Sequence, residues 1–178
     1  MDERYDRTMA RQHADAVDRI VEQWHEVRPR FDASPIHVVG RVSRLSRLVD
    51  KRLAVNFGEH GLENWMYDVL ATLRRSGAPY ELTAGDLVAQ TMVTTGAMTN
   101  RIDRLQDLGY VERRPGTDRR TVIVGLTESG RTKVDDVSTS HMDTERELLG
   151  ALSPKQQDQL ASLLRTVLLS LDDTPPAT

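Results

Sequence analysis

The chain has 178 residues, with 24 Lys and Arg, 27 Asp and Glu, and no cysteine. This length fits one domain, or one domain with an extension for oligomerisation. The lack of cysteine excludes disulfides, thiolate metal sites and cysteine-based peroxide sensing. The net charge of −3 excludes a general coat of positive charge, so any contact with nucleic acid must come from a local basic patch.

The hydropathy pattern favours a cytoplasmic protein. A membrane helix needs roughly 20 apolar residues, and a signal peptide needs an apolar segment near the N-terminus. The sequence has no such run, and residues 1–15 are polar. Aromatic residues make up only 4% of the chain, so we expect a core of aliphatic side chains in a mainly helical fold.

Apolar residues repeat at helical spacing in the first third of the chain. One amphipathic pattern runs from about Thr8 to Val27, and a second runs from Val38 to Leu53. These patterns predict N-terminal helices within residues 8–57. The polar face of the second helix carries five cations: Arg41, Arg44, Arg47, Lys51 and Arg52. This face suits DNA or another anion, or a solvated surface paired with acids from elsewhere in the chain.

The chain is organised around the stretch Leu82–Thr127, which follows a third predicted helix, Leu62 to about Arg75. A Thr-x-x-Asp pattern at Thr83 begins one short helix, and Thr94 offers an N-cap for a second, which stops at Gly109. Two helices joined by a tight turn make a helix-turn-helix, in which the second is the expected recognition helix.

The predicted recognition helix has a polar face that suits the major groove of DNA. Side chains of this kind can reach base edges and phosphates. We predict that these residues of the helix bind DNA: Thr94, Thr95, Thr99, Asn100, Arg101 and Arg104.

A charged hairpin is predicted directly after this helix. Two β-prone runs, 110–114 and 121–124, flank the turn sequence Pro115–Asp118. Beside a helix-turn-helix such a hairpin is a wing, and arginine at its tip suits the narrow, electronegative minor groove. The wing adds four residues to the predicted DNA contacts: Arg114, Asp118, Arg119 and Arg120. From Thr94 to Arg120 there are six Arg and four acids, a local charge of +2, which favours site-selective binding.

Two further helices are expected after the wing, within residues 128–171. Thr127 caps the first, and Ser153 with Gln156 forms a capping box at the start of the second. The second helix carries an apolar stripe that continues to Leu171. We expect the terminal helices to be buried against a second chain around a two-fold axis; the alternative is packing within one monomer. The tail 172–178, with two prolines, is predicted to be disordered.

A family resemblance rests on TGAMTNRIDRLQDLGYVERR and on DRR followed by VxLTxxG. At these residues the chain resembles the MarR family of winged-helix transcription regulators. The resemblance implies a mainly α fold with a small β-hairpin wing, assembled as a homodimer. It also implies a single MarR-like unit over 1–178, with 62–127 as the DNA-binding region, double-stranded DNA as a partner and no cofactor.

Two further segments, 23–35 and 68–77, resemble the urate-responsive subgroup of that family, which includes the PecS, HucR and TamR type regulators. This resemblance covers about Ala14 to Leu171 and implies an extra N-terminal helix. It implies an effector pocket made of four residues: Trp24, Asp68, Arg101 and Arg113. Arg104 and Arg114 are close enough in sequence to leave the choice of arginines open.

The four residues suit a planar anion. A tryptophan offers an aromatic wall, two arginines offer bidentate donors, and a carboxylate that favours the empty state can act as a switch. Each residue also has an ordinary explanation, because Trp24 fits a core position, Asp68 fits a helix salt bridge and the arginines fit phosphate ligands. Urate, xanthine, aconitate and citrate all remain open as effectors.

We interpret the chain as a homodimeric, ligand-responsive DNA-binding regulator, a repressor released from a pseudo-palindromic operator. The main alternative is a winged-helix protein-interaction module that does not bind DNA, although such a module would be expected to expose apolar residues on its wing. An enzyme is a third possibility without a visible catalytic motif. The five histidines are scattered and show no metal-binding spacing: His13, His25, His37, His60 and His141.

Overall fold

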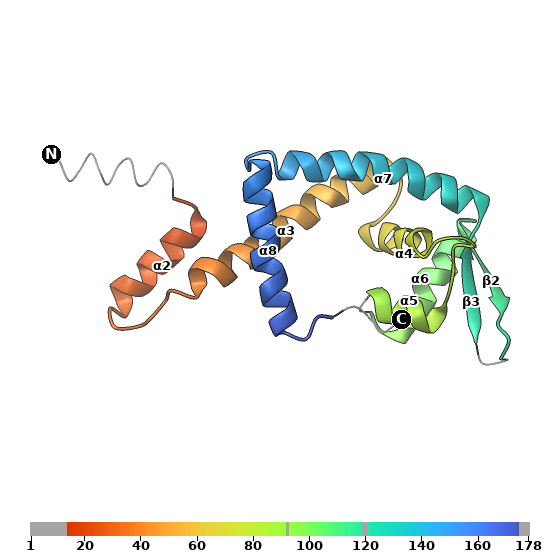
Figure 1. Ribbon diagram of the computed structural model, residues 1–178, viewed down its shortest axis with the longest axis horizontal. Helices are drawn as coiled ribbons and strands as arrows, with labels where there is room; N and C mark the ends of the chain where they lie inside the picture. The colour runs from red at the N-terminus through yellow and green to blue at the C-terminus, as the bar shows by residue number, and fades with distance from the viewer. Residues whose placement is uncertain (1–13, 92, 119–120, 175–178) are drawn as a thin grey trace. The chain divides into compact units, whose positions relative to one another are not determined.

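The computed structural model describes residues 14–91, 93–118 and 121–174. The chain divides into two compact units, Met1–Lys51 and Arg52–Thr178. Most of the described residues are helical, and one small sheet lies in the second unit (Figure 1). None of the described helices is long and apolar enough to cross a membrane.

In the N-terminal unit, helix α2 (Ala16–Val27) packs on the first part of helix α3 (Ile36–Glu59). Val17 of α2 is buried, and a Cβ added to Gly40 would lie 3.1 Å from its Cγ1 atom. The sequence pattern predicted a single helix from Thr8, but Asp15 starts α2 by accepting hydrogen bonds from the backbone N–H groups of residues 17 and 18. This cap fixes the helix start at Ala16. Residues 8–13 of the predicted helix lie outside the described residues.

The core of the second unit is built around helix α4 (Asn64–Arg75), which begins two residues later than expected. Its side chains Val69, Leu70 and Leu73 have no exposed surface, and the helix contacts α5, α6, α7 and strand β3. As expected from the composition, this core is mainly aliphatic. These four elements therefore take their positions from one central helix.

The predicted helix-turn-helix is confirmed as α5 (Ala84–Thr91) and α6 (Thr95–Asp107). Thr94 caps α6 by accepting a hydrogen bond from the backbone N–H of residue 97 at 3.3 Å. Gly109 follows the helix with a φ of +73°, which favours glycine and ends the helix as predicted. One side of α6 is buried through Met98, Ile102 and Leu105, so the opposite side is turned outward.

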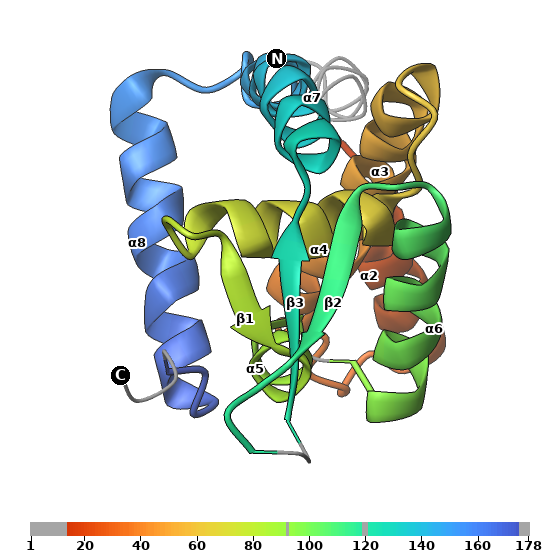
Figure 2. The ribbon, with the colours of Figure 1, turned by 90° about the vertical axis from the view of Figure 1, so that its right-hand side faces the viewer.

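The sheet has three antiparallel strands in the order β1-β3-β2. Strands β2 (Val111–Pro115) and β3 (Val122–Leu126) form the predicted hairpin. Strand β1 (Glu81–Thr83) was not predicted, since three residues are too short to show an alternating pattern. In Figure 2 the strands lie side by side with α4 behind them, and no described helix covers the face turned to the viewer.

The two faces of this sheet have different partners. Val124 pairs with Leu82 and Arg113, and its buried side chain marks the inner face toward the helices. Gly125 pairs with Glu81, and Ile123 pairs with Arg114, which places these residues on the outer face. Successive side chains of a strand point to opposite faces, so the neighbouring residues Arg113 and Arg114 point away from each other.

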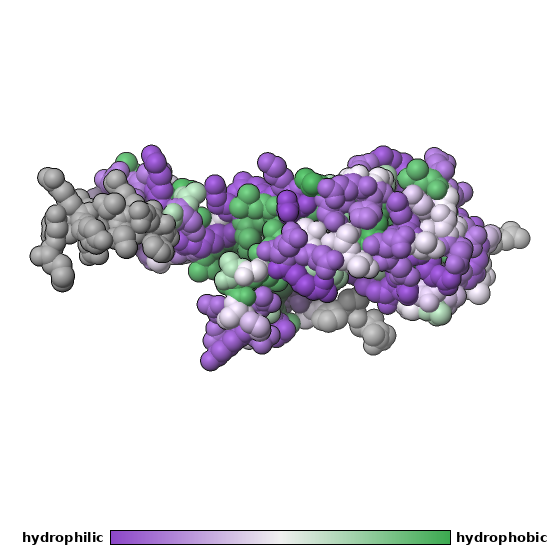
Figure 3. Space-filling model, turned by 90° about the horizontal axis from the view of Figure 1, so that it is seen from above, coloured by the Kyte–Doolittle hydropathy of each residue, from purple (hydrophilic) through white to green (hydrophobic). Residues whose placement is uncertain are grey.

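Helices α7 (Glu128–Leu148) and α8 (Pro154–Ser170) end the fold, and both predicted caps are present. Thr127 accepts a hydrogen bond from the backbone N–H of residue 130, and Ser153 and Gln156 form the capping box. None of the residues of α8 is buried. Exposed hydrophobic side chains are visible as green areas on the molecular surface (Figure 3).

Candidate DNA-binding surface and effector residues

Helix α6 presents small polar side chains to solvent. Thr95, Thr99 and Asn100 are exposed, and the Thr99 hydroxyl donates to the Thr95 carbonyl oxygen at 3.1 Å. By the 3.6-residue repeat, Asn100 lies opposite the buried side of the helix, whereas Thr95 and Thr99 lie at the edge of that side, next to Met98 and Ile102. The exposed face therefore matches the face that the sequence predicted for base contacts, while the Thr94 hydroxyl is engaged in the cap.

Two arginines of α6 pack against Trp65 at the start of α4. The guanidinium carbons of Arg101 and Arg104 lie 5.7 and 5.0 Å from the centre of the Trp65 ring. Glu63 accepts hydrogen bonds from the Trp65 Nε1 atom at 2.9 Å and from the Arg104 Nη2 atom at 2.7 Å, and both lower the pKa of Glu63. Glu63 lies 41 residues before its arginine partner, so no local pattern in the sequence indicates this contact. Arg104, a predicted DNA contact, is therefore tied to its own chain.

Arg113 joins the wing to the recognition helix. Its guanidinium donates to the Thr99 carbonyl oxygen at 3.3 Å and to the Gln106 Oε1 atom at 3.4 Å, and it forms an ion pair with Asp103. All three partners belong to α6. Because Arg113 lies on the inner face of the sheet and Arg114 on the outer face, only Arg113 is in position to act on α6.

Arg114 has a partner on the opposite side of the sheet. Its Nε atom donates to the Glu81 Oε1 atom at 3.2 Å, and its Nη2 atom is paired with Oε2. The bonds from Arg114 lower the pKa of the Glu81 carboxyl. At the wing tip Asp118 is exposed, and the predicted contacts Arg119 and Arg120 lie outside the described residues.

Asp68 lies half-buried on α4. Burial raises the pKa of its carboxyl above the ordinary value, while the positive charges of Arg75 and Arg101 act in the opposite direction. Both side chains are described, and the positive charge of Arg101 acts on Asp68 without a hydrogen bond or ion pair between these two described residues. The two groups therefore influence each other through space, a weaker coupling than direct contact.

Trp24 belongs to the N-terminal unit. Its ring centre lies 5.0 Å from that of Phe31, and 36% of the residue surface is exposed, so it is not an interior core residue. The guanidinium of Arg28 lies over the same Phe31 ring at 5.0 Å. Trp24 therefore has both an aromatic neighbour and surface exposed to solvent.

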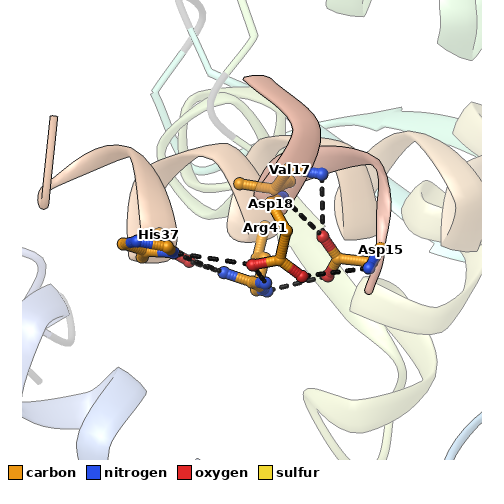
Figure 4. A network of polar contacts seen from close by, with 5 residues as sticks. All are labelled: Asp15, Val17, Asp18, His37 and Arg41. Atoms are coloured by element: carbon orange, nitrogen blue, oxygen red, sulfur yellow. Dashed lines mark hydrogen bonds and ion pairs between the residues drawn. The ribbon is translucent and has the colours of Figure 1, made fainter. Parts of the chain in front are cut away.

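The helix that carries Trp24 is fastened by a polar network (Figure 4). The Arg41 guanidinium donates to Asp15 Oδ2 at 2.8 Å and to Asp18 Oδ1 at 2.6 Å, and these charges hold α2 on α3. The bond from Arg41 lowers the pKa of Asp18. Arg52, another cation of the same predicted polar face, pairs with Glu147 at 3.3 Å. Arg41 and Arg52 are therefore paired with acids from elsewhere in the chain, which is one of the two alternatives given for this polar face.

A cavity of about 400 Å³ lies between the helix-turn-helix and the start of strand β3. Thr95 and Thr99 of α6 and Thr121 and Val122 of the hairpin are among its lining residues. Asp68, Arg101 and Arg113 do not line it. Within the described part of the chain, no group of three or more His, Asp or Glu side chains is arranged to hold a metal ion.

A helix-turn-helix followed by a β-hairpin, with an exposed polar face on its second helix, defines a winged helix-turn-helix protein. The sequence pattern of the MarR family matches residues 60–121. The chain is also 38% identical over 152 residues to the HTH-type transcriptional regulator PecS of Dickeya dadantii, an alignment that covers 85% of this chain and 92% of that protein. The chain belongs to the MarR family, a family of transcription regulators and not of enzymes.

Solved structures agree with this assignment. A mutant MarR from E. coli, crystallised with operator DNA, is 26% identical, with a TM-score of 0.67 over 82% of this chain and 97% of that one. AbsC of Streptomyces coelicolor, a MarR family transcriptional regulator, superposes with a TM-score of 0.72 over 82% of this chain and 99% of that one. At 22% identity, AbsC supports the fold alone. The predicted mainly α winged-helix fold is confirmed.

The raised pKa of Asp68 predicts a pH-dependent stability. The Asp68 carboxyl binds its proton more tightly in the folded protein than in the unfolded chain. The contribution of Asp68 to stability is therefore present below its pKa in the unfolded chain and is lost as pH rises through its pKa in the folded protein. Asp68→Asn should raise the free energy of unfolding at pH 7, and the gain should vanish below about pH 4, where both side chains are neutral. Urea denaturation across this range measures it.

Asp136→Asn is the control, because Asp136 is exposed on α7 and the substitution makes the same chemical change. It should leave the free energy of unfolding nearly unchanged at both pH values. A destabilised Asp68→Asn protein at pH 7 would show that attraction to Arg75 and Arg101 outweighs the cost of burying the charge.

Proposed function

We propose that the protein is a homodimeric, ligand-responsive repressor that binds a pseudo-palindromic operator in double-stranded DNA. The observation that carries the proposal is the outward polar face of α6, held beside the β2–β3 hairpin by the contacts of Arg113. Thr99 and Asn100 have the size and hydrogen-bonding groups needed at base edges in a major groove. The likeness to PecS and to a MarR crystallised with operator DNA supports the same reading.

The predicted DNA contacts divide into two groups under this proposal. Thr95, Thr99, Asn100 and Arg101 supply the groove-facing surface of α6, and the wing tip, with Asp118, Arg119 and Arg120, supplies the second contact. Arg104 can reach a phosphate only by leaving Glu63. Base contacts should therefore contribute more to selectivity than the number of arginines suggests.

The DNA-binding proposal predicts that Asn100→Ala and Arg101→Ala each weaken binding to the DNA upstream of the protein's own gene. A lost base contact costs about 1–3 kcal/mol, or roughly fivefold to 150-fold in affinity. Binding of the wild type should weaken as salt rises, because phosphate contacts release counterions. Fluorescence anisotropy at several salt concentrations measures both effects.

Lys155→Ala is the matched control, since it removes one exposed positive charge from α8, away from α6. It should leave affinity unchanged. If the wild type showed no retention of this DNA even at low salt, the winged-helix protein-interaction module would become the better reading.

The dimer proposal rests on helix α8. Its apolar stripe includes Leu163, Val167 and Leu171, which are 67%, 51% and 70% exposed in the single chain. A contiguous apolar patch of this kind is costly to leave in water, and a second copy of the same helix can cover it around a two-fold axis. Two recognition helices related by that axis would meet half-sites about one DNA turn apart.

The assembly predicts that Leu163→Glu with Val167→Glu produces a monomer, because two charges would have to be buried in an apolar interface. Light scattering of the wild type should give the mass of two chains, and the variant the mass of one. Ser162→Glu, on the same helix but outside the apolar stripe, is the control and should remain dimeric. A monomeric wild type at micromolar concentration would remove the basis for a palindromic operator.

The effector proposal concerns Trp24, Asp68, Arg101 and Arg113. Burial raises the pKa of the Asp68 carboxyl and so disfavours its charged form, whereas the positive charge of Arg101 favours that form. An anion that competes for Arg101 and Arg113 would withdraw that support and loosen the contacts of Arg113 with α6. Ligand and DNA would then each weaken the binding of the other by the same factor.

This proposal predicts that urate, xanthine, citrate or trans-aconitate releases the protein from DNA. Trp24→Phe, Asp68→Asn and Arg113→Ala should each raise the concentration needed, because each removes part of the site or of the switch. Arg131→Ala is the control for Arg113→Ala, since Arg131 is also an arginine paired with a carboxylate, that of Glu128. The effector site is wrong if a releasing anion acts equally on all four variants.

A further inference from the structure

An ion pair on the outer face of the sheet crosses the middle strand. Glu81 lies on β1 and Arg114 on β2, and β3 separates the two strands. The Arg114 guanidinium is nevertheless bonded to both carboxylate oxygens of Glu81, with Nε to Oε1 at 3.2 Å. This bidentate contact joins strands that share no backbone ladder.

Gly125 of β3 makes this crossing possible. Gly125 pairs with Glu81 in the strand register, and a Cβ added to it would lie 3.0 Å from the Glu81 Cγ atom and 3.4 Å from Oε1. Gly125 is buried although it lies on the outer face, because the Glu81 side chain passes over it. A glycine within a strand is a usual sign of such a close approach.

The alternative role for Arg114 is that of a phosphate ligand, as predicted from the sequence. The sheet geometry disfavours it, because Arg114 points away from α6, whereas Arg113 contacts α6 directly. The guanidinium fork of Arg114 also already has a carboxylate that matches its geometry. The bonds from Arg114 lower the pKa of Glu81, so the carboxylate stays charged at neutral pH.

We propose that Glu81 and Arg114 are wing-positioning residues: their ion pair ties β2 to β1 across β3 and so fixes the hairpin against the helix-turn-helix. Strand β1 leads directly into α5, which begins at Ala84, so a tie to β1 is also a tie to the first helix of the motif. Arg114 then acts on DNA binding through the orientation of the wing and not through a phosphate. This role rests on the DNA binding proposed above.

The tie can be tested in the free protein by amide hydrogen exchange of β2 and β3. Glu81→Gln and Arg114→Gln should each speed exchange in the hairpin by a similar factor, and the double variant should add little, because either change removes the same contact. Glu112→Gln is the matched control: Glu112 also pairs with Gly125 and carries the same charge, but among the described side chains it acts on Arg114 only through its charge, without a hydrogen bond. Unchanged exchange in Glu81→Gln would overturn the proposal.

The consequence for function is tested by DNA affinity as a function of salt. Both single variants should weaken binding in the same direction, by roughly threefold to tenfold, with the salt slope of the wild type retained. If Arg114 were a phosphate ligand, Arg114→Gln would reduce the log–log slope by about 0.9, and Glu81→Gln would leave binding unchanged or tighter, which would overturn the positioning role.

A variant in which the two side chains are swapped, Glu81→Arg with Arg114→Glu, separates position from charge. It should restore slow hydrogen exchange and much of the affinity lost in the single variants, since the same ion pair can form in reverse. If the swapped variant exchanged as fast as the single variants, the positioning role would be contradicted. A wild type that fails to bind DNA would contradict the proposed function, while the exchange measurements would still decide whether the tie exists.

Discussion

The packing of helix α6 against α4, α5 and strand β2 is the constraint on which the recognition surface depends. Met98, Ile102 and Leu105 are at most 2% exposed, and burial of such side chains contributes about 1.5–3 kcal/mol each. Their spacing fixes the rotation of α6 about its axis, and that rotation turns Thr99 and Asn100 outward. The polar face is therefore set by apolar packing before any charged group is considered.

Ion pairs refine this arrangement. Glu63 with Arg104 ties α6 to the start of α4, and Asp103 with Arg113 ties α6 to the wing. Exposed pairs of this kind are worth up to about 1 kcal/mol each, less than the buried side chains beneath them. Contacts of this strength orient elements that packing already holds, and a phosphate or a small anion can replace them at modest cost. That property would suit the ligand response proposed above.

Local signals made much of the fold predictable. The caps at Thr94, Thr127 and Ser153 depend on residues at most three positions away, so the sequence shows them directly. Strand β1 and the partners of the arginines were not visible, because Glu63 and Glu81 lie 41 and 33 residues from Arg104 and Arg114. Because side chains alternate along a strand, the sequence does place Arg113 and Arg114 on opposite faces, but only the folded sheet shows which face contacts α6.

The charge of the recognition region changes when these partners are counted. Residues 94–120 carry six Arg and four acids, an excess of +2. Glu63 and Glu81 lie outside this segment but each holds one of its arginines, and adding their two negative charges reduces the excess to zero. A surface with so little net charge attracts phosphates weakly, so in the proposed mode of binding the hydrogen bonds from α6 to base edges would carry a large part of the selectivity. The negative charge of the whole chain, −3, works in the same direction, because it lowers affinity for DNA that offers no matching bases.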